Sequence, residues 1–408
     1  MATLKPFRIL RPAYDKAGEV CTLPYDVMNT DEARAMAENR PNSFLRVTRS
    51  EIEFPADANP YSDEIYEHGA QNLHRMIDDG VLVREENPVY MIYRQIMGNH
   101  TQYGIVGAAS CAEYDSGIIK KHELTRPDKE DDRTRHINIL GAQTGAVFLT
   151  YPAQPAIDEI VKEQAGRTPD IDFTSEDGIR HSAWIVRDPV VISNLEQQFA
   201  RIPALYVADG HHRSAAASRV ARERNADANA PAGVFLTVSF PDNQVQILGY
   251  NRVIKDLNGH TKEDFLSQLM EIAEVLTPPP AHEPREKGEV TMYLDGDWYL
   301  LRWKPAIATR GDAVAQLDVS VLQDNVLSPL LAIGDPRTDK RISFVGGIRG
   351  TAELEKLVNS GQFAVAFALF PTSIQDLMTI ADQDGLMPPK STWFEPKLRD
   401  AMAVHVID

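Results

Sequence analysis

The segment 204–219, ALYVADGHHRSAAASR, constrains the fold of this chain more than any other stretch. Leu205, Tyr206 and Val207 are typical of the end of a buried strand, and the alanine-rich run after Gly210 favours a helix. A strand that passes through a glycine turn into a helix is typical of α/β proteins, which bind ligands at the carboxyl ends of strands. The segment therefore predicts a ligand site at this turn.

The start of the predicted helix is suited to anions. A helix N-terminus exposes unpaired N–H groups and carries partial positive charge, and a glycine lets a ligand approach the backbone. The guanidinium of an arginine in the first turn can clamp two phosphate oxygens. We therefore expect Gly210, Arg213 and Ser214 to bind phosphate.

The same turn carries three further titratable side chains. Asp209 lies at the carboxyl end of the strand and can hold Mg²⁺, which prefers one or two carboxylates with phosphate oxygens and water. His211 and His212 can donate to a transferring phosphoryl group or shuttle a proton. The structural alternative is a helix cap, with Asp209 capping the helix, both histidines solvated and Arg213 in a surface ion pair.

A second charged segment, IIKKHELTRPDKEDDRTRH, lies upstream at residues 118–136. Glu123 and His122 follow a predicted strand, so the carboxylate can face the same site, and we expect His122 to contact the substrate. Pro127 suits the first turn of a helix, and acidic residues follow it at the positive helix end. The basic residues expected to support phosphate binding are Arg126, Arg133 and His136, and the last two share a helix face. Most charge runs of this kind are solvated helix surfaces, which is the alternative.

Two N-terminal motifs contribute weaker candidates. If a strand carries FLRVTR, residues 44–49, then Arg46 faces one side and Arg49 the other, and one of them can reach an anionic ligand. Asp26, in LPYDVM, is either a substrate contact, for example to an amine, or part of a turn.

Length and charge restrict the function classes. A chain of 408 residues suggests two or three domains, or one large α/β unit with insertions. We place a boundary between residues 1–250 and 251–408. The 42 basic and 59 acidic residues give a net charge of −17, which disfavours nucleic-acid and membrane partners and leaves a small-molecule substrate. Two cysteines, with no apolar leader and no membrane-length apolar run, favour the cytoplasm.

Several catalytic signatures are missing. The sequence has no Gly-x4-Gly-Lys-Ser/Thr loop, no protein-kinase catalytic loop and no Gly-x-Ser-x-Gly elbow. HELTR differs from the zinc-protease motif because Arg126 replaces the second histidine. Classical kinase, serine-hydrolase and metalloprotease mechanisms are therefore not supported.

The motifs also resemble known families. DGHHRSAAA resembles the phosphate-binding turn of the ParB/sulfiredoxin-like superfamily, and the Asp-Gly-His-His-Arg turn is very similar to that of its free serine kinases. Nearly the whole chain resembles the bacterial family called "domain of unknown function 1015". The matching segments are Leu23–Met28, Asn42–Glu51, Lys120–His136, Tyr206–Ala217, Asp335–Gly350 and Met387–Leu398.

The resemblance implies a fold and an activity. The fold would be mixed α/β, with a ParB/sulfiredoxin-like core that carries large insertions and a second α/β region that packs on it. By similarity to free serine kinases, Glu123 would be the general base for the hydroxyl of L-serine or a similar hydroxy acid. The phosphoryl donor would be ATP, ADP or pyrophosphate, with Mg²⁺ as cofactor.

Two other functions remain open at this point. One is a non-catalytic module that binds nucleotide and changes conformation, as other members of the superfamily do. The second is a metal-dependent phosphohydrolase that uses the histidine pair. The oligomeric state is also open, with a homodimer among the possibilities.

Overall fold

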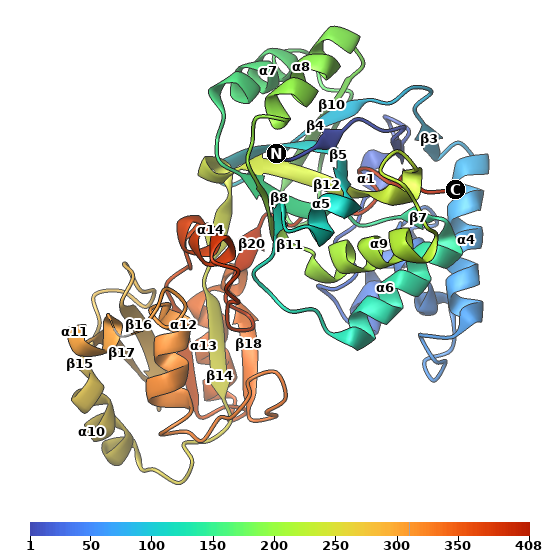
Figure 1. Ribbon diagram of the computed structural model, residues 1–408. Coiled ribbons are helices and arrows are strands. Elements are labelled where there is room, and N and C mark those ends of the chain that lie inside the picture. Colours follow the sequence, from blue (N-terminus) through green and yellow to red (C-terminus); the bar gives the residue numbers. More distant parts are fainter. Residues whose placement is uncertain (310) are drawn as a thin grey trace. The chain divides into compact units, whose positions relative to one another are not determined.

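The computed structural model describes residues 1–309 and 311–408, which form two units (Figure 1). The first unit contains Met1–Val245 and Pro396–Asp408, and the second contains Gln246–Glu395. The division expected from the sequence assigned all residues after 250 to the second region. The last residues instead belong to the first unit, where β21 (His405–Val406) pairs with β7 (Ala142–Gln143).

A nine-stranded mixed sheet forms the centre of the first unit. Its strands run in the order β6-β11-β8-β12-β5-β4-β10-β9, and β1 pairs with β5. The β6–β11 and β8–β12 pairs are parallel, and the other pairs are antiparallel. The strands are β1 (Leu4–Lys5), β4 (Tyr90–Met97), β5 (His100–Ser110), β6 (Ile119–Lys120), β8 (Val147–Tyr151), β9 (Ile171–Thr174), β10 (Arg180–Val186), β11 (Leu205–Asp209) and β12 (Val234–Pro241).

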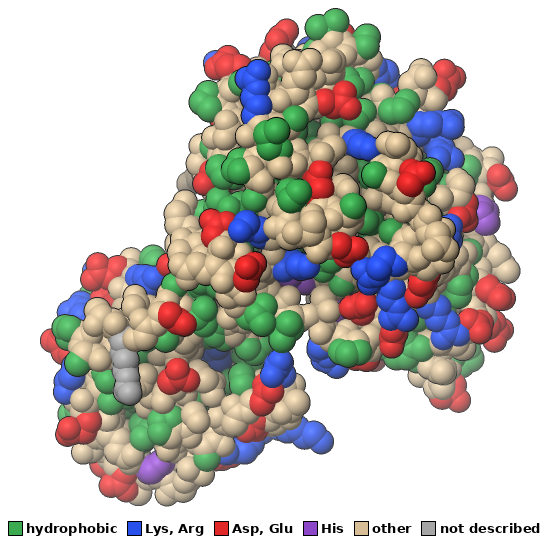
Figure 2. Space-filling view, viewed as in Figure 1, with side chains coloured by type: hydrophobic (Ala, Val, Ile, Leu, Met, Phe, Trp, Pro, Cys, Tyr) green, Lys and Arg blue, Asp and Glu red, His purple; other side chains and the backbone are tan. Residues whose placement is uncertain are grey.

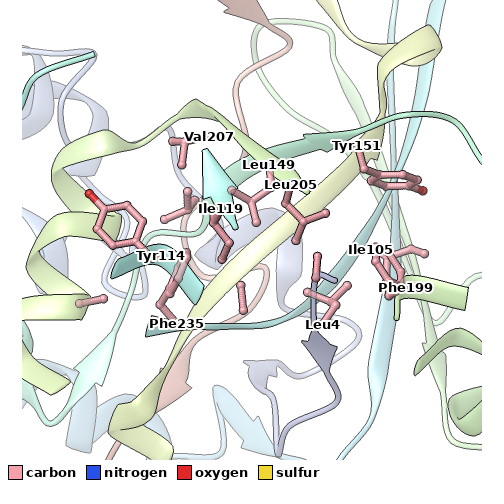
Figure 3. Close-up of a cluster of buried hydrophobic side chains, with 14 of the residues drawn as sticks. Leu4, Ile105, Tyr114, Ile119, Leu149, Tyr151, Phe199, Leu205, Val207 and Phe235 are labelled. Atoms are coloured by element: carbon pink, nitrogen blue, oxygen red, sulfur yellow. The ribbon is translucent and has the colours of Figure 1, made fainter. Parts of the chain in front are cut away.

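The sheet and its helices share one hydrophobic core. Ile119, Leu149, Leu205 and Val207 come from three neighbouring strands and are buried together (Figure 3). The helices α7 (Pro155–Ala165), α8 (Pro189–Phe199) and α9 (His211–Glu223) bury apolar side chains in the same cluster. Because each fully buried large apolar side chain contributes about 1.5–3 kcal/mol, this core holds β11 and the start of α9 in place.

Helices α6 (Pro127–Leu140) and α9 pack against each other beside the sheet. The predicted helix start at Pro127 is confirmed, with the proline in the first turn. Ala215, Ala216 and Ala217 of α9 are buried, and their small side chains allow a close approach of neighbouring elements. The remaining helices of the first unit are α1 (Ala17–Val20), α2 (Thr30–Ala37), α3 (Leu45–Thr48), α4 (Asp63–Asp78) and α5 (Cys111–Asp115), and β2 (Leu10–Pro12) pairs with β3 (Leu82–Arg84).

The strand considered for residues 44–49 is wrong, because Leu45–Thr48 form the short helix α3. Phe44 and Val47 are both fully buried, in a cluster with Leu73 and Met76 of α4. A spacing of three residues places Phe44 and Val47 on one face of a helix but on opposite faces of a strand. Packing on α4 therefore selects the helix.

The second unit contains a six-stranded antiparallel sheet in the order β15-β17-β16-β19-β14-β18. No helix or strand lies between β15 and β16, as the prolines of this segment predict. The strands are β14 (Tyr250–Ile254), β15 (Ala273–Leu276), β16 (Glu289–Leu294), β17 (Asp297–Trp303), β18 (Ile342–Gly346) and β19 (Val365–Leu369), with β13 (Gln246–Leu248) paired to β20 (Trp393–Glu395). The helices are α10 (Lys262–Ile272), α11 (Pro305–Ala308), α12 (Asp318–Leu322), α13 (Gly350–Asn359) and α14 (Ile374–Asp382).

Acidic and basic side chains are interspersed over the face shown in Figure 2. Within the described residues, every helix is too short or too polar to span a membrane.

Candidate functional site

The parallel pairing of β6 with β11 brings the two predicted site segments together. Leu205 pairs with Ile119, and Tyr206 pairs with Lys120. Parallel strands end at the same edge of a sheet, so the residues that follow β6 lie beside the residues that end β11. His122 and Glu123 therefore meet the turn at Asp209 and the first turn of α9.

Glu123 lies next to the first residue of α9. Its Oε2 is 3.9 Å from Nδ1 of His211, and its side chain is 41% exposed while that of His211 is 5% exposed. The ring of His122 meets that of His211 edge-on, with centroids 4.4 Å apart. The structure therefore brings Glu123 and both neighbouring histidines into one cluster that solvent reaches through the carboxylate.

Both histidines of this cluster are neutral at pH 7. Burial lowers the pKa of His122 to about 4, although the charge of Asp209 acts in the opposite direction. Burial also lowers the pKa of His211 well below its usual value, and the neighbouring His122 adds to this effect. A neutral imidazole has one N–H donor and one lone pair, so these side chains interact with a ligand through hydrogen bonds or coordination rather than charge.

Gly210 forms the turn between β11 and α9 with a φ of +102°. No side chain caps α9, so its first N–H groups lack an intrahelical partner. A Cβ atom at Gly210 would lie 3.0 Å from Nε and 3.1 Å from Cζ of Arg213. The glycine therefore supplies both the left-handed backbone and the space into which the Arg213 guanidinium folds back.

Arg213 is buried rather than part of a surface ion pair. Its Nη1 donates to the carbonyl of Ala146, and its Nη2 lies 3.6 Å from Oδ1 of Asp209. Its Nε is buried without a hydrogen-bond partner in the described residues. Burial opposes the positive charge, but the carboxylates of Asp209 and Asp26 outweigh it and raise the pKa. The side chain is thus a permanent cation behind the turn.

Asp209 has a partner that the sequence reasoning missed. Lys397 donates from Nζ to Oδ2 of Asp209 over 3.1 Å. Burial opposes ionisation of Asp209, but the charges of Lys397 and Arg213 outweigh it and hold the pKa well below its usual range. The one signal in the sequence was that Lys397 falls within the family-like segment Met387–Leu398.

Asp26 is exposed, and His212 is half-buried in the first turn of α9. Burial lowers the pKa of His212, while the charge of Asp26 acts against this shift. The backbone N–H of Arg126 donates to Nε2 of His212 over 3.0 Å. The guanidinium of Arg126 is 62% exposed and pairs with Asp128, so this residue contacts the turn through its backbone.

Arg133 and His136 lie deeper, on α6. Arg133 pairs with Asp132 at 2.8 Å, and its guanidinium lies 3.9 Å from the centroid of the Tyr25 ring. His136 Nε2 lies 3.3 Å from the carbonyl of Val47, and burial lowers its pKa to about 3. With Arg213 they line a cavity of about 20 Å³, which is large enough for a single water molecule but too small for phosphate. In this structure the side chains of Arg133 and His136 are both engaged in contacts within the protein.

Two predicted ligand contacts have structural roles here. Arg46 donates to the carbonyls of Ala37 and Arg40 and pairs with Glu53, so its guanidinium holds the helices of residues 30–53 together. The buried hydroxyl of Ser214 donates to the carbonyl of His211 over 3.0 Å. Ser214 therefore touches the cluster around Glu123 through the backbone carbonyl of His211.

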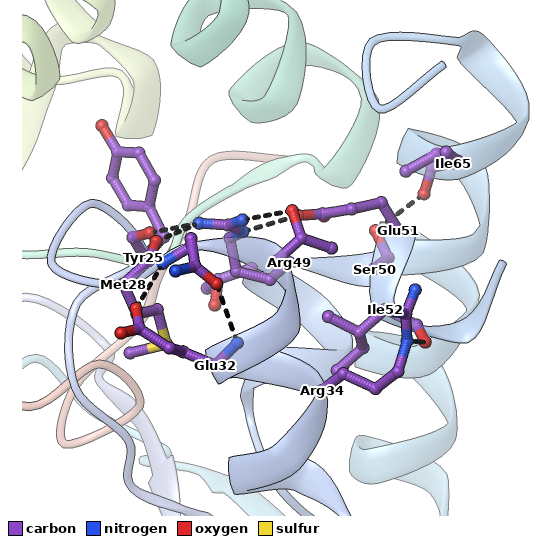
Figure 4. A network of polar contacts seen from close by, with 12 residues as sticks. Tyr25, Met28, Glu32, Arg34, Arg49, Ser50, Glu51, Ile52 and Ile65 are labelled. Carbon is purple, nitrogen blue, oxygen red and sulfur yellow. Dashed lines mark hydrogen bonds and ion pairs between the residues drawn. The ribbon is translucent and has the colours of Figure 1, made fainter. Parts of the chain in front are cut away.

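Arg49 positions the loop that carries Asp26. Its Nη1 donates to the carbonyls of Tyr25 and Met28, each over 2.8 Å, and its Nε pairs with Glu51 (Figure 4). Since the guanidinium spans two carbonyls of one loop, it fixes the backbone next to Asp26. Arg49 therefore acts on the site through the loop.

The fold and site define a mixed α/β protein with an arginine-backed helix N-terminus facing an acidic side chain. The chain belongs to the family described as "Protein of unknown function (DUF1015)", whose sequence model matches residues 4–320. No curated protein matches the sequence.

Solved structures that match the chain include two enzyme complexes and two other proteins. A variant of free serine kinase in complex with ADP is 14% identical with a TM-score of 0.35, and covers 71% of this chain and 87% of its own. Free serine kinase in complex with AMP is 13% identical with a TM-score of 0.34, and the match covers 71% of this chain and 86% of that protein. A conserved hypothetical protein from Pyrococcus furiosus is 14% identical with a TM-score of 0.34, and the match covers 73% of this chain and 93% of that protein. C-terminally truncated SbnI from Staphylococcus aureus is 11% identical with a TM-score of 0.38, and the match covers 72% of this chain and 85% of that protein.

Proposed function

We propose that this protein is a phosphotransferase that phosphorylates the hydroxyl of free L-serine or a similar small hydroxy acid. The observation that carries the proposal is the position of Glu123, whose partly exposed carboxylate lies 3.9 Å from the first residue of α9. A base therefore stands beside a backbone site that favours anions. Phosphoryl transfer needs this pairing of a positioned base with charge-stabilising groups.

In the proposed reaction Glu123 orients the acceptor hydroxyl and takes its proton. The hydroxyl oxygen forms a bond to the terminal phosphorus of the donor, and the bond from that phosphorus to the bridging oxygen breaks. The leaving group would be ADP when ATP is the donor, AMP when ADP is the donor, and phosphate when pyrophosphate is the donor. The N–H groups at the start of α9 would hold the phosphoryl oxygens, with Arg213 adding positive charge behind them.

Asp209 fits the proposed Mg²⁺ better than the histidines do. It offers carboxylate oxygens, which Mg²⁺ prefers, and Lys397 and Arg213 keep it ionised. Mg²⁺ held by Asp209 and the donor phosphates would neutralise charge on the phosphoryl group. Lys397 would contribute a second positive charge at the same carboxylate.

The test is a panel of hydroxy amino acids and hydroxy acids, each incubated with ATP, ADP or pyrophosphate and Mg²⁺ and followed by phosphorus-31 NMR. We expect a new phosphomonoester signal with L-serine or a close analogue. Absence of product with every donor would overturn the proposal. Nucleotide binding that needs Arg213 but gives no product would instead support the non-catalytic nucleotide-binding alternative.

A further inference from the structure

Two buried imidazoles beside Glu123 have nitrogens without partners. His122 is 2% exposed and His211 is 5% exposed. Nδ1 of His122 and Nε2 of His211 have no hydrogen-bond partner in the described part of the chain. Leaving a buried polar atom unsatisfied costs about 1–3 kcal/mol, and an ion bound at Nδ1 of His122 would remove that cost. The nitrogen of His211 that faces Glu123 is Nδ1, so this atom is its candidate ligand.

The spacing of the cluster fits a metal ion. One ligand atom each of His122, Glu123 and His211 lies within 4.8 Å of the others. The 3.9 Å between Nδ1 of His211 and Oε2 of Glu123 is too long for a hydrogen bond. Two ligand atoms bonded at about 2.1 Å to a tetrahedral ion lie roughly 3.4 Å apart, so this pair must close by about half an ångström to share one ion. A single ion can therefore bind all three after side-chain shifts of less than about 1 Å.

The ligand types select the class of metal. Two imidazole nitrogens and one carboxylate suit Zn²⁺ and other first-row transition metals, whereas Mg²⁺ prefers oxygen ligands. Three protein ligands leave coordination positions open. Because the Glu123 side chain is 41% exposed, those positions can be reached from solvent.

The backbone holds the three residues in register. His122 and Glu123 follow β6, and His211 begins α9 directly after the strand that pairs with β6. The carboxylate of Asp209 acts electrostatically on both imidazoles, so it would also offset the charge of a divalent cation. We propose that His122, Glu123 and His211 form a transition-metal site, with Zn²⁺ as the ion that represents the class.

This site is independent of the proposed phosphotransferase activity, because metal binding needs neither donor nor acceptor. A Zn²⁺ ion on Glu123 would occupy the carboxylate that serves as base in the proposed reaction. Zn²⁺ bound here is therefore expected to suppress phosphotransfer while Mg²⁺ supports it. The binding experiment below reads the metal directly, so failure of one proposal does not decide the other.

The experiment uses the full chain after removal of metal with a chelator. Zn²⁺ is titrated against a chromophoric chelator, and Co²⁺ is added separately to record its visible absorption. We expect one equivalent of Zn²⁺ and a Co²⁺ spectrum typical of a mixed nitrogen and oxygen site. Glu123→Gln and His211→Asn should each weaken Zn²⁺ binding by more than about 100-fold, because even changes behind the ligands cost roughly 10–100-fold.

His212→Asn is the matched control, since it removes a neighbouring imidazole on the same helix turn that is outside the three-residue cluster. Its Zn²⁺ affinity should equal that of the unmodified chain. Less than one equivalent of Zn²⁺ bound at micromolar concentration would overturn the proposal, as would equal affinity in all variants. If His211→Asn fails to fold by circular dichroism, Glu123→Gln decides, because its side chain is partly exposed.

Discussion

The ammonium of Lys397 lies 3.1 Å from Oδ2 of Asp209, although the two residues are 188 positions apart in the chain. The C-terminal segment of the first unit thus supplies a cation to the end of β11. The Lys397 side chain is 13% exposed, so its charge is only weakly screened by solvent. The carboxylate of Asp209 is therefore kept ionised from both sides, by Lys397 and by Arg213.

Lys397→Met should weaken binding of pyrophosphate. The substitution removes one of the two cations beside Asp209 and leaves more negative charge at the turn. Because each loss of about 1.4 kcal/mol of attraction lowers affinity tenfold, we expect a loss of roughly 10-fold. Isothermal titration calorimetry with pyrophosphate measures this change. Lys390→Met removes the same charge from an exposed lysine and should bind like the unmodified chain. Equal binding by all three proteins would show that Lys397 has only a structural role.

Glu123→Gln should reduce phosphotransfer by about 10²- to 10⁴-fold, which is the usual contribution of a general base. The variant should keep the melting temperature of the unmodified chain, because the side chain is partly exposed. Asp128→Asn, which removes an exposed carboxylate from the same segment, serves as control and should retain activity. The rate of phosphomonoester formation is the readout, and full activity of Glu123→Gln would contradict the assigned role.

Gly210→Ala should destabilise the fold by roughly 1–3 kcal/mol from its backbone conformation alone. Gly210→Ala should lower the free energy of unfolding by more than Gly117→Ala does. Gly117 also has a positive φ, of +79°, but open space surrounds it, whereas a Cβ at Gly210 meets Arg213. Urea unfolding of both variants separates the two contributions. A smaller loss at Gly210 than at Gly117 would show that the guanidinium moves away at no cost.

Asp400→Asn should stabilise the protein above pH 7. Burial raises the pKa of Asp400 to about 7 against the opposing charge of Arg213, whereas an unfolded aspartate titrates near its ordinary value. The folded state therefore binds more protons between about pH 4 and pH 7, so this group lowers the free energy of unfolding as the pH rises through that range. The asparagine side chain mimics the neutral acid, so the free energy of unfolding of the variant does not fall for this reason as the pH rises.

Melting temperatures recorded between pH 4 and pH 8 test this sign. The variant should exceed the unmodified chain at pH 8, and the difference should shrink towards pH 4. Asp31→Asn, which removes a carboxylate that is 92% exposed, should leave the profile unchanged. A gap that is constant with pH would mean that ionisation of Asp400 is not the cause.

Local sequence was sufficient for the elements that carry the candidate site. The strand, glycine turn and helix around Gly210 were predictable because apolar β-formers, a glycine and a run of alanines act within a few residues. Pro127 marked the start of α6 for the same reason. Local preference failed at Leu45–Thr48, where burial of Phe44 and Val47 against α4 selected a helix.

Long-range pairing decided which side chains share the site. The parallel register of β6 and β11 placed Glu123 beside His211, and the return of the C-terminal segment to the first unit placed Lys397 beside Asp209 and Asp400 near Arg213. These contacts depend on loop closure and core packing across the chain, which leave no signature in neighbouring residues. The sequence by itself determined the anion-favouring helix start, and only the tertiary structure decided which charges surround it.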